Sequence, residues 1–332
     1  MTFDNKTILV TGGTGSFGQA FTEYVFEKYK PLKVIIFSRD EMKQWDMAFK
    51  YKNNPNIRFF IGDVRDKERL NRAFKSVDYI VHAAATKIVP TAERDPFECV
   101  KTNIMGAMNV IDAAIDNGVS RVVALSTDKA SSPVNLYGAT KLASDKLFVA
   151  SGAYGIDNTK FSVVRYGNVM GSRGSVIPFF LKCAELGEVP ITDRRMTRFM
   201  ITLRQGIELV EHAFTDMKGG EIYVKKIPSM NIMDLADAIA PHAIKREVGI
   251  RPGEKIHEQM VGIEDAASTY EYDNYFKILP TTISEEDRKV VSRGGVLVQP
   301  NFLYSSDKNT EWMSKDDLIQ FVADNRNKFL KV

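Results

Sequence analysis

The chain contains few cysteines and histidines, and their scarcity excludes two kinds of protein. Its 332 residues include two cysteines, Cys99 and Cys183, which lie far apart and in no metal-ligand spacing. A disulfide scaffold is therefore not expected, and a reducing compartment fits the composition. The four histidines form no ligand motif either, so we predict no metal site.

Long hydrophobic runs and an excess of one charge are also missing. No apolar run approaches the roughly 20 residues that span a bilayer. The chain also runs from its first residues directly into a strand pattern, without a signal peptide. A net charge of +3 is too small to indicate non-specific binding to nucleic acid. We therefore expect a cytoplasmic, soluble enzyme without a membrane or nucleic-acid partner.

Short β-branched runs alternate with longer helical stretches through the first half of the chain. We expect strands at residues 7–11, 33–37, 57–61, 79–83, 121–126 and 161–165. The helices are expected at residues 15–29, 40–51, 67–74, 96–117 and 137–154. This alternation predicts an α/β fold with a Rossmann-type, doubly wound parallel sheet. Ligands of such sheets lie beyond the carboxyl ends of the strands.

The rhythm breaks after Arg165, which suggests a second unit. We predict a nucleotide-binding Rossmann domain over residues 1–170, to which a helix and a strand within 203–226 return. Residues 171–202 and 227–332 are assigned to a smaller C-terminal α/β lobe that binds the substrate. Within this lobe, the polar segment 273–293 is expected to be rich in loops.

A glycine-rich segment joins the first strand to the first helix. It reads Thr11-Gly12-Gly13-Thr14-Gly15-Ser16-Phe17-Gly18. Glycine lets the backbone approach a pyrophosphate, whose charge the helix N-terminus stabilises. The position within a βαβ unit favours a dinucleotide cofactor over a mere tight turn. We expect cofactor contacts from Gly12, Thr14, Gly15, Ser16, Phe17 and Gly18.

The end of the second strand indicates NADP as the cofactor. NAD enzymes usually carry Asp or Glu about 20 residues after the glycines, where this chain has Ser38, followed by Arg39 and, one turn later, Lys43. These side chains suit a 2′-phosphate. Asp40 is better interpreted as the N-cap of the next helix, and Arg39 could instead be a solvated surface residue. Further cofactor contacts are expected from the ends of the third and fourth strands, namely Asp63, Val64, Ala83 and Ala84.

Tyr137 and Lys141 share one face of a predicted helix, because they are four residues apart. A free tyrosine has a pKa of about 10. A neighbouring ammonium and a cationic nicotinamide would lower it, so that the phenol can accept a proton from a hydroxyl. Thr127 is expected to bind the substrate hydroxyl. Leu125 and Ser126, at the end of the fifth strand, are expected to contact the cofactor together with Tyr137 and Lys141.

These motifs resemble the extended short-chain dehydrogenases/reductases. Within that superfamily, residues 125–130 (LSTDKA) and 135–141 (NLYGATK) closely resemble the inverting UDP-N-acetylglucosamine 4,6-dehydratases, which open pseudaminic acid biosynthesis. The similarity runs almost from end to end and includes residues 166–178 (YGNVMGSRGSVIP) and 251–255 (RPGEK). Membrane-bound relatives carry an N-terminal helical anchor that this chain lacks, so it resembles the short soluble type.

The resemblance implies that UDP-N-acetylglucosamine is dehydrated with inversion at C5, giving UDP-2-acetamido-2,6-dideoxy-β-L-arabino-hex-4-ulose. Oxidation at C4 makes the C5 proton acidic, so a base and an acid are needed besides Tyr137. We assign Lys129 to the C5 proton and protonated Asp128 to the 6-hydroxyl. Retaining relatives carry Asp-Glu here. As a base, Lys129 must be neutral, so we expect a lowered pKa. Both side chains reach the sugar only if the strand has already ended. Lys129 could instead be a phosphate or surface lysine.

Contacts to the nucleotide sugar follow from the resemblance. They are expected from Lys87, which is also assigned to the cofactor, and from Asn168, Arg173, Val176, Thr192, Arg198, Arg251 and Glu254. Each charged member could instead form a structural salt bridge. The helices at 96–117 and 137–154 resemble the pair that dimerises in this superfamily, so we expect a homo-oligomer, a dimer or a larger assembly such as a hexamer.

Two other functions remain open. An NADP-dependent nucleotide-sugar epimerase, or a combined epimerase and dehydratase for capsule or O-antigen precursors, would use the same Tyr137 and Lys141. Simple epimerisation needs no Asp128–Lys129 pair. A redox sensor or scaffold could bind NADP(H) without turnover, but such proteins commonly lose the tyrosine or the lysine.

Overall fold

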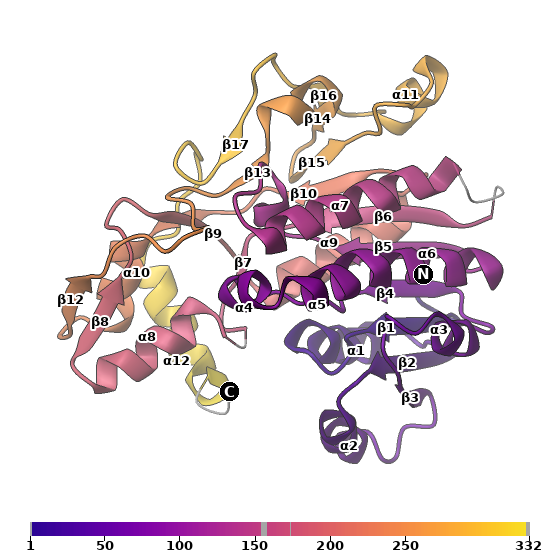
Figure 1. The fold of residues 1–332 in the computed structure, drawn as a ribbon, viewed down its shortest axis with the longest axis horizontal. Coiled ribbons are helices and arrows are strands. Elements are labelled where there is room, and N and C mark those ends of the chain that lie inside the picture. Colours follow the sequence, from indigo (N-terminus) through magenta and orange to yellow (C-terminus); the bar gives the residue numbers. More distant parts are fainter. Residues whose placement is uncertain (1, 154–157, 173, 330–332) are drawn as a thin grey trace.

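The computed structural model describes residues 2–153, 158–172 and 174–329 and is built around a ten-stranded sheet (Figure 1). Part of this sheet is parallel, with the strand order β3-β2-β1-β4-β5-β6-β10. The bounds of these strands are β1 Thr7–Thr11, β2 Lys33–Ser38, β3 Ile57–Ile61, β4 Tyr79–His82, β5 Arg121–Leu125, β6 Lys160–Arg165 and β10 Ile222–Lys225. The order is that of a doubly wound Rossmann fold, and the predicted fold class is confirmed.

Helices cover both faces of the parallel strands, which explains why β1 is buried along its whole length. Helices α1 (Ser16–Lys28) and α9 (Leu203–Asp216) contact each other in one layer. Helices α3 (Lys67–Ala73), α6 (Gly106–Asp116) and α7 (Leu136–Ala150) form the other. Helix α2 (Glu41–Lys50) contacts β2 and the edge strand β3. Residue 154, the predicted end of the last long helix, lies outside the described residues.

The helix predicted at residues 96–117 is interrupted. It consists of α5 (Pro96–Val100), a π-helical turn (Lys101–Met105) and α6. The π turn directs Asn103 toward the loop after β4, where its amide accepts from the Thr86 N–H and donates to the Thr86 carbonyl, both at 2.9 Å. A side-chain bond to this loop therefore accompanies the departure from regular geometry. A further short helix, α4 (Val89–Arg94), was not predicted.

The sheet continues past β10 with antiparallel strands from the C-terminal third of the chain. They are β15 (Tyr275–Ile278), β14 (Thr269–Glu271) and β16 (Val296–Leu297). The segment 273–293 was predicted to be rich in loops, but β15 and helix α11 (Glu285–Val291) occupy about half of it. The apolar side chains of Phe276 and Ile278 are buried against the core, which outweighs the polar composition around them. These strands belong to the main sheet, although residues 227–332 were predicted to form part of the smaller lobe.

The smaller lobe has its own apolar core. Ile177, Ile191, Leu235 and Leu318 contribute to it from α8 (Val176–Glu185), β8 (Glu188–Ile191), α10 (Ile232–Ile239) and α12 (Lys315–Phe329). Two small sheets contribute to the lobe: β8 with β12 (Ile244–Glu247), and β9 (Thr197–Ile201) with β7 (Asn168–Val169) and β11 (Ser229–Asn231). A third, β13 (Gln259–Val261) with β17 (Tyr304–Ser305), packs against the main core through Met260, Val261 and Tyr304. Within the described ranges, no helix has both the length and the apolar character that a membrane crossing requires.

Candidate active site

The glycine-rich loop lies where β1 meets α1 and fits a dinucleotide. Gly12 has φ +65°, and a Cβ there would lie 2.9 Å from the backbone nitrogen of Ala84. A Cβ on Gly18 would collide with the backbone of Gly13. Helix α1 begins at an N-cap glycine, Gly15, without a side-chain cap. Its first N–H groups can therefore bind a phosphate.

The end of β2 holds the polar side chains predicted to select NADP. The Asp40 carboxylate accepts from the Lys43 N–H at 3.0 Å, so its predicted role as the N-cap of α2 is confirmed. The Lys43 ammonium lies 2.8 Å from Oδ2 of Asp40. The Arg39 side chain is 60% exposed and lies 3.6 Å from Asp63. The Ser38 hydroxyl accepts from the Gln44 amide at 3.0 Å. Two cations thus stand at the surface where a 2′-phosphate is expected.

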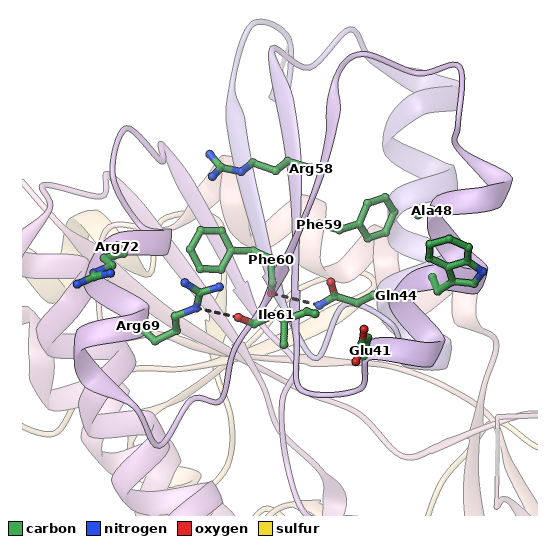
Figure 2. A pocket seen from close by; sticks show the side chains of 10 residues that line it. Glu41, Gln44, Ala48, Arg58, Phe59, Phe60, Ile61, Arg69 and Arg72 are labelled. Atoms are coloured by element: carbon green, nitrogen blue, oxygen red, sulfur yellow. Dashed lines mark hydrogen bonds between the residues drawn. The ribbon is translucent and has the colours of Figure 1, made fainter.

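A hollow of about 640 Å³ lies beside this end of the sheet, between α2 and β3 (Figure 2). Gln44, Phe60 and Arg69 are among its lining residues. The Arg69 guanidinium lies 4.0 Å from the centre of the Phe60 ring and donates to the Ile61 carbonyl at 2.8 Å. None of the predicted catalytic residues lines this hollow, so it is separate from the chemistry described next.

Tyr137 and Lys141 are both buried on α7, at the carboxyl edge of the sheet. Burial raises the pKa of Tyr137 to about 12, while the Lys129 charge and a hydrogen bond from Thr127 act in the lowering direction. Burial also lowers the pKa of Lys141. Lys129 thus supplies one ammonium that favours the phenolate. The role expected of Lys141 beside Tyr137 stays a prediction.

Helix α7 lies unusually close to the turn that carries Asp128 and Lys129. A Cβ on Gly138 would lie 3.0 Å from Cβ of Pro133, 3.1 Å from the carbonyl carbon of Lys129 and closer still to its oxygen. The Asn135 side chain caps α7 by accepting from the Gly138 N–H at 2.8 Å. Glycine at 138 is therefore what allows Tyr137 to approach the turn.

A buried ionic network lies behind Tyr137 and Lys141. The Ser126 hydroxyl donates to Asp145 at 2.7 Å, and the Arg165 guanidinium lies 3.2 Å from the same carboxylate oxygen. The Asp145 charge acts to raise the pKa of Lys141 against burial. Sequence reasoning missed Asp145 and Arg165, although Asp145 follows Lys141 by four residues and so shares its helix face. The Ser126 side chain faces this network, and its predicted contact with the cofactor stays a prediction.

Asp128 and Lys129 lie in a 3₁₀ turn (Asp128–Ala130) that begins two residues beyond the end of β5, after Ser126 and Thr127. Because the strand has ended, both side chains turn to the same side, as the prediction required. The Lys129 ammonium lies 3.0 Å from Oδ1 of Asp128, which also accepts from the Thr127 hydroxyl at 2.9 Å. Asp128 is only 1% exposed, and its Oδ2 has no hydrogen-bond partner. The predicted acid–base pair is therefore in contact, with Asp128 buried and the Lys129 side chain 24% exposed.

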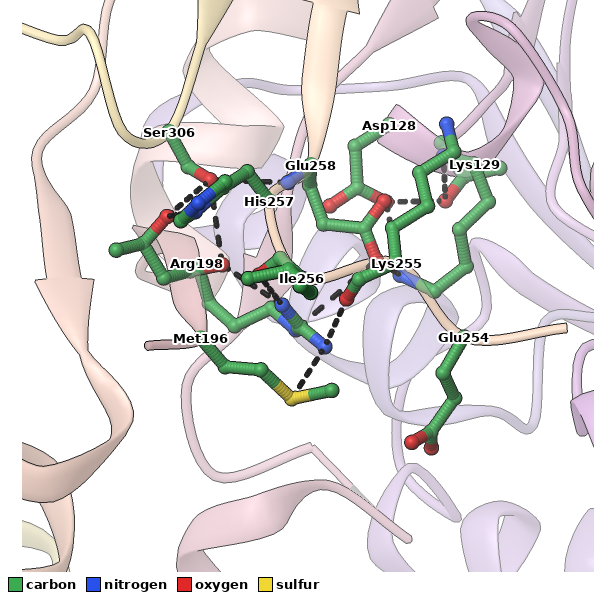
Figure 3. Close-up of polar contacts among 12 residues, drawn as sticks. Asp128, Lys129, Met196, Arg198, Glu254, Lys255, Ile256, His257, Glu258 and Ser306 are labelled. Atoms are coloured by element: carbon green, nitrogen blue, oxygen red, sulfur yellow. Dashed lines mark hydrogen bonds and ion pairs between the residues drawn. The ribbon is translucent and has the colours of Figure 1, made fainter. Parts of the chain in front are cut away.

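A residue that the sequence analysis missed completes this cluster. Oε1 of Glu258, on the segment before β13, lies 3.3 Å from the Lys129 ammonium (Figure 3). Burial disfavours the ammonium, but the carboxylates of Asp128 and Glu258 outweigh this effect and raise the pKa of Lys129. The expectation of a lowered pKa for Lys129 is therefore not met. Residues 129 and 258 are far apart in the sequence, so no local spacing links them.

Arg198 holds the segment that carries Glu258. Its guanidinium donates to the backbone carbonyls of Thr197, Ile256 and Lys255 at 2.8, 2.9 and 3.1 Å. This arrangement is structural, and pairing of Arg198 with a phosphate stays a prediction. Arg251 is exposed and lies 3.8 Å from Glu254, whose Oε2 is buried without a partner.

The other predicted substrate contacts occupy loops and element ends. Lys87 lies in the loop after β4, Asn168 begins β7, Val176 begins α8 and Thr192 follows β8. Arg173 lies outside the described residues. Among the described residues, no group of three or more His, Cys, Asp or Glu side chains could hold a metal ion.

The glycine cradle, the Tyr137–Lys141 pair and the adjoining acid–base cluster define an enzyme of the short-chain dehydrogenase/reductase class. Residues 8–280 match a family described as "Polysaccharide biosynthesis protein". An inverting UDP-N-acetylglucosamine 4,6-dehydratase of Campylobacter jejuni is 54% identical over 328 residues, which are 96% of this chain and 98% of that protein. The chain belongs to this polysaccharide biosynthesis family, and its resemblance to the inverting dehydratases is confirmed.

Two further comparisons refine the picture. A UDP-glucose 4-epimerase of Rickettsia bellii is 45% identical over 286 residues, or 83% of each chain. The X-ray structure of Pen from Bacillus thuringiensis superposes with a TM-score of 0.90 at 35% identity, over 98% of this chain and 99% of that one. Epimerases are thus also similar to this chain, but over a smaller part of it.

Proposed function

We propose that this chain dehydrates UDP-N-acetylglucosamine across C5 and C6 with inversion at C5, giving UDP-2-acetamido-2,6-dideoxy-β-L-arabino-hex-4-ulose. The observation that carries the proposal is the contact of Asp128 and Lys129 in one buried cluster whose charge acts on Tyr137. Simple epimerisation does not require such an acid–base pair. The similarity to the Campylobacter jejuni enzyme supports the same reaction, which would begin pseudaminic acid-type biosynthesis for a flagellin glycan or surface polysaccharide.

The cofactor of the proposed reaction is NADP. The bound nicotinamide would supply the hydride acceptor for oxidation at C4 and the hydride donor for reduction at C6, without net consumption. The loop from Gly12 to Gly18 would hold its pyrophosphate, because side chains are excluded there and the helix terminus is open. Arg39 and Lys43 would pair with the 2′-phosphate, since both present exposed cations at the end of β2.

The residues of the chain divide the proton transfers between them. Tyr137 would accept the proton of the 4-hydroxyl, with Thr127 orienting that hydroxyl. The ammonium of Lys129 favours the phenolate against burial. The C5 proton, made acidic by the new C4 ketone, would pass to Lys129. Protonated Asp128 would donate to the departing 6-hydroxyl, which leaves as water. Asp128 would regain a proton when Tyr137 gives up the one taken from the 4-hydroxyl, so both groups return to their starting state.

The function is tested by incubating the purified enzyme with UDP-N-acetylglucosamine in heavy water and following the product by NMR. The proposal expects loss of one water, one deuterium at C5 and the L-arabino configuration. A product of only D-xylo configuration would identify a retaining dehydratase with an unusual base.

An NADP-dependent epimerase, or a combined epimerase and dehydratase, is the second candidate, because the Rickettsia bellii relative is a UDP-glucose 4-epimerase. It predicts a C4-inverted sugar that keeps its 6-hydroxyl, so the same NMR spectra separate the two.

We also propose a cytoplasmic homo-oligomer, a dimer or a larger assembly such as a hexamer. Large apolar side chains are exposed along α5, the π turn and α6, with Phe97 at 77%, Met105 at 52% and Met108 at 50%. Exposed apolar side chains on one helical layer favour contact with another protein surface. Light scattering of the wild type and of Phe97→Glu tests this, because the variant should dissociate.

A further inference from the structure

Glu258 is held rigidly in the acid–base cluster by its own backbone. Its N–H donates to the Ser306 hydroxyl at 2.9 Å, and its carbonyl accepts from the Ser306 N–H at 2.8 Å. The Ser306 hydroxyl also contacts that of Thr197 at 2.7 Å. These bonds join the segment before β13 to β9. They fix the Glu258 side chain against the turn that carries Lys129 (Figure 3).

Two carboxylate oxygens in the ionic cluster around Glu258 lack hydrogen-bond partners. Oε1 lies 3.3 Å from the Lys129 ammonium and 4.0 Å from Nε of Arg198, whereas Oε2 is buried without a partner. Asp128 also has one buried oxygen without a partner. The Lys255 ammonium donates to the Ser131 carbonyl at 2.7 Å, although its charge still acts on both carboxylates. Structural ion pairs normally satisfy their buried oxygens. This cluster therefore retains sites that can take up a proton.

Lys129 needs such an acceptor. As the base at C5 it must be uncharged, yet two carboxylates stabilise its ammonium. Asp128 has to be protonated for the 6-hydroxyl and cannot serve. Resting on the function proposed above, we propose that Glu258 is the proton-exchanging partner of Lys129, taking the ammonium proton on Oε1 once C4 has been oxidised.

The exchange balances over one turnover. One N–H bond of Lys129 breaks, its electrons stay on nitrogen, and the proton bonds to the Glu258 carboxylate. The free amine then removes the C5 proton and becomes an ammonium again. The proton on Glu258 is the one that C5 gains when the double bond is reduced. Inversion requires that it reach the face of C5 opposite Lys129, and because Glu258 contacts Lys129 a water must carry it there. Glu258 thus ends as the carboxylate it was at the start.

Three variants test this assignment. Glu258→Gln keeps the shape and removes the charge, and Glu258→Asp keeps a carboxylate. Glu247→Gln is the matched control, because Glu247 pairs with Arg194 on an exposed strand of the smaller lobe. In protein labelled with ¹³C at the lysine ε carbon, Lys129 is assigned by the signal lost in Lys129→Arg. Its titration midpoint should fall by roughly 1–3 pH units in Glu258→Gln and stay unchanged in Glu247→Gln.

Single-turnover kinetics supply the second measurement. In Glu258→Gln, C4 oxidation should stay within about threefold of the wild type, whereas water loss should slow by roughly 100-fold or more near neutral pH. The rate of water loss should then recover as the pH rises, because bulk base can deprotonate Lys129. Glu258→Asp should retain more activity than Glu258→Gln.

A purely structural role would give different results. Equal loss of C4 oxidation and water loss, a loss that does not depend on pH, or an unchanged Lys129 midpoint would each overturn the assignment. Water loss within threefold of the wild type would overturn it too. If the wild type does not dehydrate UDP-N-acetylglucosamine, the proposed function fails, while the Lys129 titration still decides whether the two residues share a proton.

Discussion

Replacement of Gly138 by alanine tests whether the approach of α7 to the Asp128–Lys129 turn is needed for activity. An added Cβ would lie 3.1 Å from the Lys129 carbonyl carbon and nearer to its oxygen. Ordinary Cβ contacts begin at 3.4 Å. The obstructing atoms are backbone, so no side chain can rotate away. Overpacking of this kind costs about 1–3 kcal/mol of unfolding free energy. A displacement of roughly 1 Å between catalytic groups can reduce the rate about 100-fold.

The assay compares Gly138→Ala with Gly152→Ala, where an added Cβ meets nothing within 4 Å. The rate of water loss from UDP-N-acetylglucosamine and the thermal unfolding midpoint are measured for both, together with NADP affinity. Gly138→Ala should lose stability and most of its rate but bind NADP nearly normally. Gly152→Ala should match the wild type. If Gly138→Ala retains more than half of the wild-type rate, close packing at this point does not set the geometry of the site.

Three further predictions concern single side chains. Tyr137→Phe should bind NADP but give no reduced-cofactor absorbance in a single turnover, and more than a tenth of the wild-type rate would place the base elsewhere. Arg39→Ala should weaken NADP binding about tenfold or more, because a charged hydrogen bond contributes roughly 1.5–3 kcal/mol; equal loss for NAD in calorimetry would contradict the assignment. Asp216→Asn should destabilise the protein at pH 7, because Asp216 pairs with buried Lys277 at 2.6 Å. Burial acts to raise the pKa of Asp216, but Lys277 outweighs it and the net shift is downward. The stabilisation is therefore present above about pH 4 and lost as the pH falls through the folded-state pKa. Denaturant unfolding should show a smaller difference in unfolding free energy between the wild type and Asp216→Asn at pH 3 than at pH 7.

The parallel sheet could be predicted from the sequence because its strands are short, apolar and separated by helices of regular period. The same reasoning did not predict β15, because Phe276 and Ile278, although buried, lie in a polar stretch of sequence. It also missed the π turn, since periodicity does not show that Asn103 bonds to the loop after β4. Tertiary contacts, not local preferences, determine these elements.

The candidate site was predictable where its residues lie at strand ends or share a helix face. Asp128, Lys129, Tyr137 and Lys141 satisfy that condition. Glu258 does not, because it reaches the cluster from a segment that is distant in sequence and is held by Ser306, Arg198 and Thr197. The carboxylate of Glu258 helps raise the pKa of Lys129, so the sequence could indicate this lysine as a candidate base but not the contact that favours its charged form.

The antiparallel strands at the end of the sheet have a consequence for how the protein is made. During synthesis the N-terminal part emerges first and begins to fold. The outer edge of β6 then stays unpaired until residues 222–225 arrive, and the outer edge of β10 until residues 275–278 follow. Unpaired sheet edges attract other chains. We therefore expect nascent chains that end between residues 165 and 275 to bind chaperones, and chains truncated there to aggregate where the complete protein does not.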